Sequence, residues 1–461
     1  MHERDETARA GATKNRVVIL GGGFGAVATA RRLERLVRGR PDVEIVLISR
    51  DNFLFVTPLL FEVFSGALEP RSCSIPIREA LRSARFIEAD VESVDLARRT
   101  VRWAGPGSNG EFVYDQLVLA LGSTPNRKMI PGSEHAFTFK TLADALLLRN
   151  YVIEQFERAD VETDARRQAE LLAFVIIGGG LVGAELVGEL TEFVDGIVPR
   201  YPNVNRDDVR FLLLEAASRI MPEVDPTLAT YAARELTGRR GVELRLNARV
   251  SAIEPHGVRL GDETILAGTV VLTAGTIPNP VIASLPVLKD RVGRIVVEPT
   301  MHCQGRPGVW ALGDCAAVPG PDGKSYPSLA QHALREGRVL AENIVAALDG
   351  GPPRPFVYRT LGVMGSLGHG KGFAQFLKIR LRGFPAWFIR HTYYLLQMPG
   401  WNRRLRLVTD WIFALLFRPD VTKLTPDGAT ASRLRDLAAA EAAASVEYGA
   451  SRPTPTAEVL Q

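Results

Sequence analysis

Two glycine-rich clusters in this chain have the residue types and spacing needed to hold phosphate groups. They read Gly21-Gly22-Gly23-Phe24-Gly25-Ala26 and Gly178-Gly179-Gly180-Leu181-Val182-Gly183. Both fit the pattern Gly-x-Gly-x-x-Gly/Ala. Its first glycine permits a tight turn, its second lets backbone approach a pyrophosphate, and its last small residue allows close packing of a helix on a strand. A helix that starts at such a turn presents unpaired N–H groups and a positive dipole end to the phosphates.

The two clusters differ in the residue expected at the end of the following strand. In the second copy Glu215 follows the run FLLL. Its carboxylate can bind both hydroxyls of a ribose and would repel a 2′-phosphate, which favours NAD over NADP. In the first copy the corresponding position is Ser49, followed by Arg50 and Asp51. Ser49 can donate to a ribose, but the adenosine end of the first site is less well defined.

The segments around each cluster predict the elements that position it. Residues 16–20 (RVVIL) read as a buried parallel strand, 26–38 as a helix and 43–48 as a second strand. The pattern recurs in the strand 173–177, a helix from about residue 181 and the strand 209–214. Each glycine cluster therefore lies between a strand and a helix in a βαβ unit, and this context separates dinucleotide binding from an ordinary tight turn.

Further strands complete two copies of one plan. Strand-like stretches cover 86–95 and 99–103, the strand 116–121 ends at Gly122, and 269–276 mirrors it in the second copy. A strand at 308–315 and a helix at 328–348 follow. We therefore predict an α/β fold with two Rossmann-like dinucleotide-binding domains, one inserted in the other. The expected boundaries are 15–130 with 285–350 for the first domain, 131–284 for the second, 351–425 for a C-terminal module and 426–461 for a weakly ordered tail.

Composition excludes several other classes of protein. The net charge of +4 over 461 residues argues against a dedicated nucleic-acid binder. Cys73, Cys303 and Cys315 have no CxxC spacing, so a disulfide scaffold and a dithiol-relay flavoenzyme are both disfavoured. We predict no metal site. The chain starts without a signal-like apolar stretch and has no apolar run of about 18 residues, so we expect a cytoplasmic protein whose attachment to a membrane surface stays open.

Several stretches resemble the two-dinucleotide-binding flavoproteins (pyridine nucleotide-disulfide oxidoreductase-like) and, within them, the type II NADH dehydrogenases, the single-chain NADH:quinone oxidoreductases. They are VVILGGGFGA, NFLFVTPLLFEVFSGALEPRSCSIPIR, YDQLVLALGSTPN, IPGSEHAFTFKTLADALLLRN, VIIGGGLVGAELVGEL, VWALGDCA and AQHALREG. The resemblance covers roughly 15–425. It implies FAD and NADH as cofactors and a membrane quinone of the respiratory chain as acceptor. It also implies no proton pumping, and a peripheral location on the cytoplasmic face of the cell membrane.

The resemblance also implies roles for individual residues. Asp314 would hydrogen-bond the ribityl–phosphate region of FAD, although an aspartate after glycine also suits a helix N-cap or an Asx-turn. Glu185 matches a family glutamate near the nicotinamide and flavin, or it is a first-turn acid favoured by the helix dipole. The residues expected at FAD are Gly21, Gly23, Phe24, Gly25, Ala26, Ser49, Arg50, Gly122, Gly313, Asp314, Ala330 and Gln331. Those expected at NADH are Gly178, Gly180, Gly183, Glu185, Glu215 and Gly275.

The chain departs from the family at the expected quinone site. The family has two glutamines four residues apart, whereas here Gln331 is kept and Arg335 replaces the second. Residues i and i+4 share one helix face and can line one pocket. A buried arginine cannot be neutralised and would favour an anionic flavin or a quinone oxyanion. Alternatively, Arg335 pairs with an acid. With Glu185, these two residues are the predicted catalytic group.

The C-terminal module interleaves basic and aromatic residues. In the helix expected over 401–417, Trp401, Leu405, Val408, Ile412, Leu415 and Leu416 follow helical spacing, with Arg403, Arg406 and Asp410 on another face. This pattern suits the headgroup region of an anionic membrane. A core-packing helix or one that forms a homodimer would show the same spacing, and no nucleic-acid module is recognisable.

Three other functions stay open on the same scaffold. A sulfide:quinone reductase needs cysteines beside the flavin, and neither Cys73 nor Cys315 matches that pair. A soluble NADH-dependent flavoprotein reductase of another acceptor would need no membrane module. A flavin/NADH redox sensor would show very slow turnover.

Overall fold

The computed structural model describes residues 15–360 and 362–423, which form two compact units. The first unit contains residues up to 56, 73–124 and 276–360, and the second contains 57–72, 125–275 and 362–423. We expected the segment 57–72 in the first domain, but it groups with the second unit. Conversely, the segment 276–284, which we expected in the second domain, groups with the first unit. Residues 362–423 do not form a separate module but group with the second unit. The predicted tail, 426–461, lies outside the described residues.

A five-stranded parallel sheet forms the centre of the first unit. Its order is β21-β9-β1-β2-β5, and the inner strands β9, β1 and β2 each contain a buried hydrophobic run, as a sheet covered on both faces requires. The strands are β1 (Asn15–Leu20), β2 (Val43–Ser49), β5 (Arg85–Glu88), β9 (Gln116–Leu119) and β21 (Val309–Ala311). The predicted strands at 16–20, 43–48, 116–121 and 308–315 are therefore confirmed, with the last two shorter than expected.

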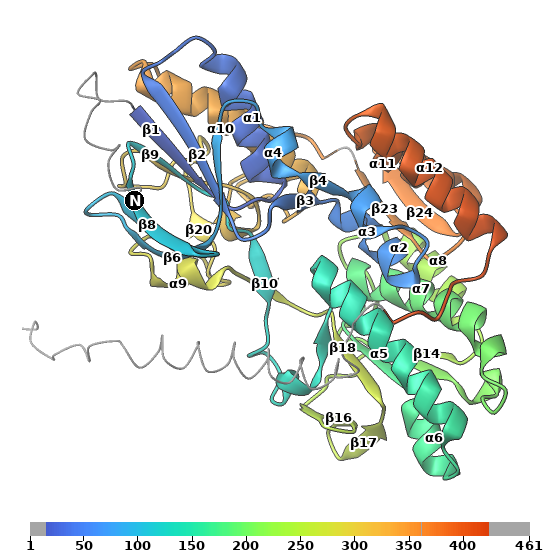
Figure 1. Ribbon diagram of the computed structural model, residues 1–461. Coiled ribbons are helices and arrows are strands. Elements are labelled where there is room, and N and C mark those ends of the chain that lie inside the picture. The colour runs from blue at the N-terminus through green and yellow to red at the C-terminus, as the bar shows by residue number, and fades with distance from the viewer. Residues whose placement is uncertain (1–14, 361, 424–461) are drawn as a thin grey trace, which may run out of the picture. The chain divides into compact units, whose positions relative to one another are not determined.

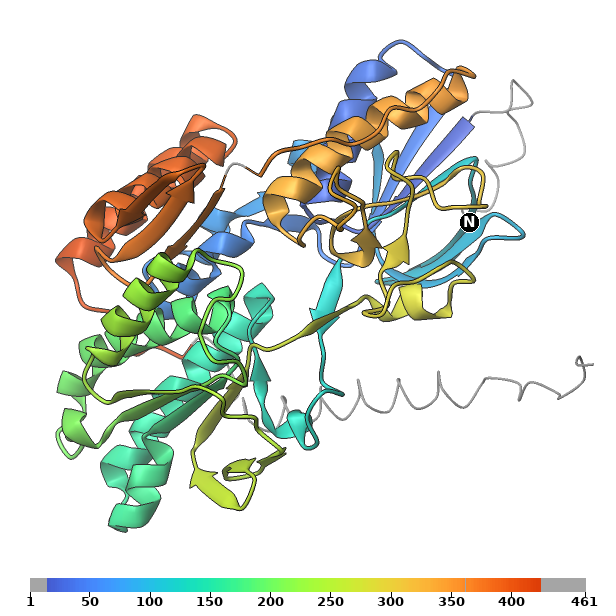
Figure 2. The same ribbon diagram turned by 180° about the vertical axis from the view of Figure 1, so that it is seen from behind.

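Two helices pack closely in this unit, α1 (Phe24–Leu36) and α10 (Ala330–Leu348), as Figures 1 and 2 show. Glycines allow the approach, because a Cβ on Gly337 would stand 2.4 Å from the carbonyl oxygen of Gly25. The smaller elements of the unit are β3 (Phe53–Phe55), β4 (Ser74–Pro76), α4 (Ile77–Ala80), β6 (Asp90–Asp95), β7 (Thr100–Gly105), β8 (Ser108–Val113), β10 (Ser123–Pro125), β19 (Thr276–Pro278), α9 (Pro280–Ser284), β20 (Ile295–Val296), η5 (Gly313–Cys315) and β22 (Ala316–Ala317).

The second unit repeats the plan with a sheet of the order β11-β18-β12-β13-β14, again parallel. Its strands are β11 (Phe137–Thr138), β12 (Ala173–Ile177), β13 (Arg210–Leu214), β14 (Val242–Arg245) and β18 (Thr269–Leu272). The helices around it are α5 (Leu142–Val161), α6 (Ala165–Leu171), α7 (Leu181–Ile197) and α8 (Pro226–Thr237). A small antiparallel sheet contains β15 (Ala252–Glu254), β16 (Gly257–Leu260) and β17 (Glu263–Leu266).

The rest of the second unit comes from two distant parts of the chain. Residues 57–72 supply η1 (Thr57–Leu59), α2 (Leu60–Ser65) and the start of α3 (Pro70–Cys73), and α2 packs on α5 and α7. The C-terminal part supplies β23 (Gly362–Ser366), β24 (Gly372–Phe376), β25 (Ile379–Arg382), α11 (Phe384–Gln397) and α12 (Trp401–Leu416). Helix α11 packs on the antiparallel sheet of β23–β25, and α12 lies beside α11 (Figure 1).

Helix α12 is confirmed at the expected place, and its apolar residues point outward. Leu407 is its one buried residue, whereas Trp401, Leu405 and Leu416 are 82%, 67% and 71% exposed. The alternative of a core-packing helix does not fit this exposure. No helix within residues 15–360 and 362–423 is both long and apolar enough to cross a membrane.

Candidate functional site

The first glycine cluster forms an open turn at the carboxyl end of β1. Gly21 has φ +112°, and a Cβ there would stand 2.3 Å from the carbonyl oxygen of Ala120, so only glycine fits. Gly23 is the N-cap of α1, no side chain caps that helix, and no heavy atom lies within 4 Å of a Cβ built on Gly23. Phe24 and Gly25 begin α1 and Ala26 is buried. This free helix N-terminus fits the pyrophosphate of a dinucleotide.

The residues predicted near the adenosine end differ in their surroundings. Ser49 ends β2, is buried, and has its hydroxyl beside Gly22, where a Cβ would stand 2.3 Å from Oγ. Arg50 is largely exposed, with Nη2 3.9 Å from Oδ2 of Asp51. Ser49 therefore lies at the turn, whereas the Arg50 side chain extends into solvent beside Asp51.

A second group of polar residues surrounds Gly313 in the same unit. Ser123 donates to Oδ2 of Asp314 at 2.8 Å, and the N–H of Gly313 donates to Glu336 at 2.8 Å. Burial raises the pKa of Glu336 to about 7, against the lowering effect of the Gly313 N–H. The N-cap of η5 is Leu312, so Asp314 does not cap that turn, in contrast to one alternative above. Gly122 (φ +69°) precedes Ser123. Sequence reasoning missed Glu336, although an acid on an otherwise apolar helix face was a usable signal.

Arg335 is anchored at the N-terminal end of α10. Its Nη1 donates to the carbonyl oxygen of Gln331 at 2.8 Å, and its guanidinium lies 4.4 Å from the ring centroid of Tyr358. Tyr358 in turn donates to Oε1 of Gln331 at 3.3 Å, and Ala330 is the first residue of the helix. No carboxylate of the described residues pairs with Arg335, so the alternative of an ion pair is not supported.

The second glycine cluster repeats the turn at the end of β12. Gly178 has φ +107°, and a Cβ on Gly183 would stand 1.9 Å from the carbonyl oxygen of Gly178. Gly180 is the N-cap of α7. Glu215 follows β13, and its two carboxylate oxygens accept from the N–H groups of Gly179 (2.6 Å) and Ala217 (2.7 Å). Lone pairs remain on both oxygens for ribose hydroxyls. Gly275, with φ +71°, lies in the connection between β18 and β19.

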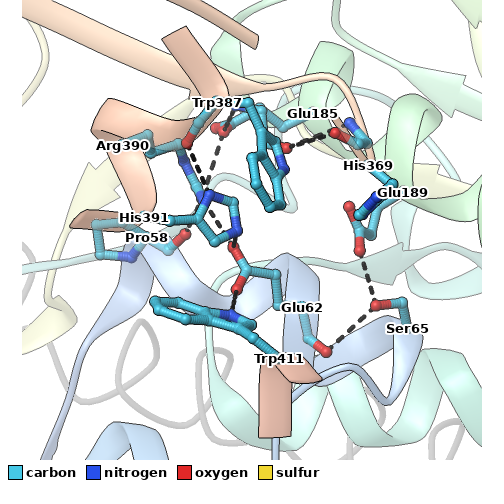
Figure 3. A network of polar contacts seen from close by, with 12 residues as sticks. Pro58, Glu62, Ser65, Glu185, Glu189, His369, Trp387, Arg390, His391 and Trp411 are labelled. Atoms are coloured by element: carbon cyan, nitrogen blue, oxygen red, sulfur yellow. Dashed lines mark hydrogen bonds and ion pairs between the residues drawn. The ribbon is translucent and has the colours of Figure 1, made fainter. Parts of the chain in front are cut away.

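Glu185 belongs to a buried network in the second unit (Figure 3). It is the fifth residue of α7 and lies beyond the first turn, so its reading as a first-turn acid is wrong. Its Oε1 accepts from the N–H of Ser366 at 2.7 Å and lies 3.7 Å from Nη2 of Arg390. Burial raises the pKa of Glu185 to about 7, and Arg390 acts in the opposite direction. This carboxyl can therefore gain or lose a proton near neutral pH.

Arg390, on α11, is 1% exposed and bonds mainly to α2. It donates to Oε1 of Glu62 at 2.6 Å and to the carbonyl oxygen of Pro58, while Nε1 of Trp411 donates to the other oxygen of Glu62 at 2.8 Å. Burial alone would raise the pKa of Glu62, but His391 and Arg390 hold it below its usual range. Removing one partner of such a buried pair costs about 3–5 kcal/mol.

A third carboxyl, Glu189, lies one helical turn after Glu185. It accepts from the hydroxyl of Ser65 at 2.7 Å, and burial raises its pKa. The Arg390 guanidinium thus lies within 4 Å of two buried carboxyls, and Glu62 is closer to it than Glu185. Glu62 and Arg390 were missed in the sequence because 328 residues separate them. In the sequence, Glu62 is the single acid within the apolar run LLFEVF, and this position could have indicated a buried, paired carboxylate.

The cysteines take no part in these sites. Cys73, Cys303 and Cys315 are buried and form no disulfide. Burial raises the pKa of both Cys303 and Cys315 to about 12, so neither is a thiolate at neutral pH. Thiol chemistry at the cofactor, the basis of the sulfide reductase alternative, is not supported.

Comparison with known proteins agrees with this geometry. Residues 15–337 match the pyridine nucleotide-disulphide oxidoreductase family, which defines the class. The chain is 30% identical over 453 residues to the type II NADH:quinone oxidoreductase Ndh of Mycobacterium tuberculosis, covering 93% of this chain and 95% of the relative. It belongs to the type II NADH:quinone oxidoreductase family.

Two further relatives extend the comparison. The demethylphylloquinone reductase NdbB of Synechocystis is 30% identical over 407 residues, which cover 86% of this chain and 95% of that protein. The structure of NDH2 from Plasmodium falciparum in complex with NADH superposes with a TM-score of 0.81 at 17% identity, over 89% of this chain and 100% of that one. At that identity the superposition establishes the fold.

The raised pKa of Glu185 predicts how stability depends on pH. Its value of about 7 lies above the ordinary 4.5, so the fold favours the protonated form and loses stability as pH rises from about 4.5 to 7. In Glu185→Gln this pH-dependent loss disappears. Between pH 5 and pH 8 the free energy of unfolding of the natural chain should therefore fall by about 2–3 kcal/mol relative to that of the variant. Urea unfolding of the FAD-loaded protein at both pH values measures this difference. The exposed Glu111→Gln is the control, and a difference independent of pH would contradict the assignment.

Proposed function

We propose that this chain oxidises NADH at bound FAD and reduces a membrane quinone by two electrons, without pumping protons. The observation that carries the proposal is the pair of glycine turns, each at the carboxyl end of a parallel strand and each opening a helix. Family membership supports the same reaction, since the M. tuberculosis relative carries the name NADH:quinone oxidoreductase.

The first unit has the residues to hold FAD. Gly21 and Gly23 leave room for the pyrophosphate at the N-terminus of α1, and Ser49 and Asp314 offer a hydroxyl and a carboxylate for sugar hydroxyls. Gln331 and Arg335 stand at the start of α10 as donors for a developing negative charge. When bound, FAD supplies the chemistry that accepts a hydride and passes on an electron pair.

The second unit has the residues to hold NADH. Gly178, Gly180 and Gly183 open the turn, Gly275 adds a second turn without a side chain, and Glu215 supports NAD over NADP. Glu185 would hold or release a proton, which the reaction needs because quinone reduction consumes one proton beyond the hydride. Its pKa of about 7 suits that role at physiological pH.

The central test is anaerobic addition of NADH to the purified protein. Bound flavin should bleach with one equivalent of NADH, and a panel of ubiquinone, menaquinone and demethylated quinones should restore its colour, with and without liposomes. Absence of flavin, or no bleaching, would refute the proposal. Bleaching without reoxidation by any quinone would instead favour a reductase of another acceptor, and very slow turnover a redox sensor.

Arg335 is the residue we expect to influence acceptor choice. Relatives of equal identity are named for different quinones, so the family alone does not fix the acceptor. The guanidinium stacked on Tyr358 adds a fixed positive charge where the family has a neutral amide.

Replacing this charge should change quinone kinetics. In Arg335→Gln we expect kcat/KM to fall by about tenfold for the preferred quinone and to change less for others, which corresponds to loss of one charge-assisted contact. The rate of flavin bleaching by NADH should stay the same. Arg338→Gln, an alteration of charge on the same helix, is the control. Unchanged kcat and KM across the whole quinone panel would contradict this role.

We further propose that α11 and α12 bind the cytoplasmic face of the membrane. The support is the concentration of exposed apolar residues on these helices, with Phe384, Phe388, Leu396, Ile412, Phe413, Leu415 and Phe417 each 49–62% exposed. Arg403 and Arg406 on α12 suit anionic headgroups. A homodimer is another way to cover such a face.

Charge on this face should prevent membrane binding. Leu405→Glu with Ile412→Glu should reduce sedimentation with anionic liposomes by more than about tenfold, since each charge opposes burial in lipid. NADH oxidation with a water-soluble quinone should persist. Leu266→Glu, an exposed apolar residue on β17, is the matched control. If liposome binding survives and analytical ultracentrifugation shows a dimer that the double variant dissociates, the face is a dimer interface instead.

A further inference from the structure

The helices that open after the two glycine turns differ in what occupies their N-termini. At α1 no side chain caps the helix, and the space at Gly23 is open. At α7 a carboxylate is already in place. Oε1 of Glu223 accepts from the N–H of Leu181 at 2.9 Å and lies 3.7 Å from the position of a Cβ on Gly180. Glu223 comes from the loop between β13 and α8, 42 residues further along the chain.

This loop holds Glu223 in position. Arg219 donates to three carbonyl oxygens, those of Met221 (3.3 Å), Pro222 (2.7 Å) and Val224 (3.1 Å). Met221 is fully buried, its N–H donates to the carbonyl oxygen of Gly179, and its φ of +48° is one that non-glycine residues rarely adopt. A backbone fixed in this way directs one exposed side chain, Glu223, to the helix N-terminus.

The N–H groups at the start of α7 are the donors that a dinucleotide pyrophosphate needs. A carboxylate there stabilises the free helix, because it satisfies an unpaired donor and faces the positive end of the dipole. A pyrophosphate cannot bind the same donor until the carboxylate leaves, and two anions at one helix end repel each other. Glu223 and the pyrophosphate therefore compete.

We propose that Glu223 is a resident anion which NADH must displace, and that it sets the affinity for the dinucleotide. This inference rests on the proposed function, in which the second unit binds NADH. It accounts for a difference between the two turns: FAD stays bound through many turnovers and faces no competitor, whereas the oxidised dinucleotide has to leave after each one. A carboxylate that returns to Leu181 promotes that exit.

The test measures binding and needs no turnover. FAD-loaded full-length protein is titrated calorimetrically with NAD⁺ and with ADP-ribose, which has the pyrophosphate but no nicotinamide. In Glu223→Gln both ligands should bind about five- to thirtyfold more tightly, as removal of one repulsive charge beside the pyrophosphate predicts. Asp262→Asn, an exposed acid on the turn between β16 and β17, removes the same charge and should leave both affinities unchanged.

A second measurement separates competition from a general charge effect. Without ligand, Glu223→Gln should melt about 1–3 °C lower than the natural chain, because α7 loses its anion. With saturating ADP-ribose, Glu223→Gln should instead have a higher melting temperature than the natural chain. Equal or weaker binding by Glu223→Gln would overturn the inference, as would equal tightening by Asp262→Asn. If the natural chain bound neither ligand, the proposed NADH site itself would fail, and the inference with it.

Discussion

Both units depend on one steric constraint: the chain must leave a buried parallel strand and enter a helix with no side chain at the turn. At Gly21 and Gly178 the backbone adopts positive φ against a neighbouring strand end, and a Cβ would collide with Ala120 or Ala274. Because no side chain stands at the turn, the first N–H groups of α1 and α7 can donate to an anion. The sheets, the helix packing at Gly25 and Gly337, and the polar residues Ser49 and Glu215 at the ends of β2 and β13 are arranged around these two helix ends.

The second physical theme is the placement of charge where water is absent. Arg390 comes from the C-terminal part of the chain and Glu62 from the segment 57–72, and their pairing joins both to the second unit. Since Glu62 makes the close contacts, Glu185 is left with one backbone N–H and a longer approach to the guanidinium. With so few partners, the buried Glu185 carboxyl is not held in its ionised form. The Glu62–Arg390 ion pair thus stabilises the second unit, while Glu185 beside it can still titrate.

The residues that could be predicted from the sequence are those whose role is local. Gly21, Gly178 and Glu215 lie in short patterns of strand, turn and helix, and the structure has them where those patterns require. What escaped prediction depends on contacts between distant segments. Nothing near Arg390 in sequence indicates Glu62, and nothing near Leu181 indicates Glu223. The grouping of segment 57–72 with the second unit also depends on such contacts, because this segment packs on α5 and α7 although it follows a strand of the other unit.

The buried thiols have a consequence for how reducing equivalents are stored. Cys73, Cys303 and Cys315 are buried and form no disulfide, so the polypeptide has no disulfide that could accept electrons. The FAD-loaded protein can then store only the single electron pair that the flavin accepts. After one molecule of NADH has reduced the flavin, an acceptor must reoxidise it before a second molecule of NADH can react. Reduction and reoxidation of the flavin therefore alternate strictly, and NADH oxidation stops as soon as the acceptor is exhausted.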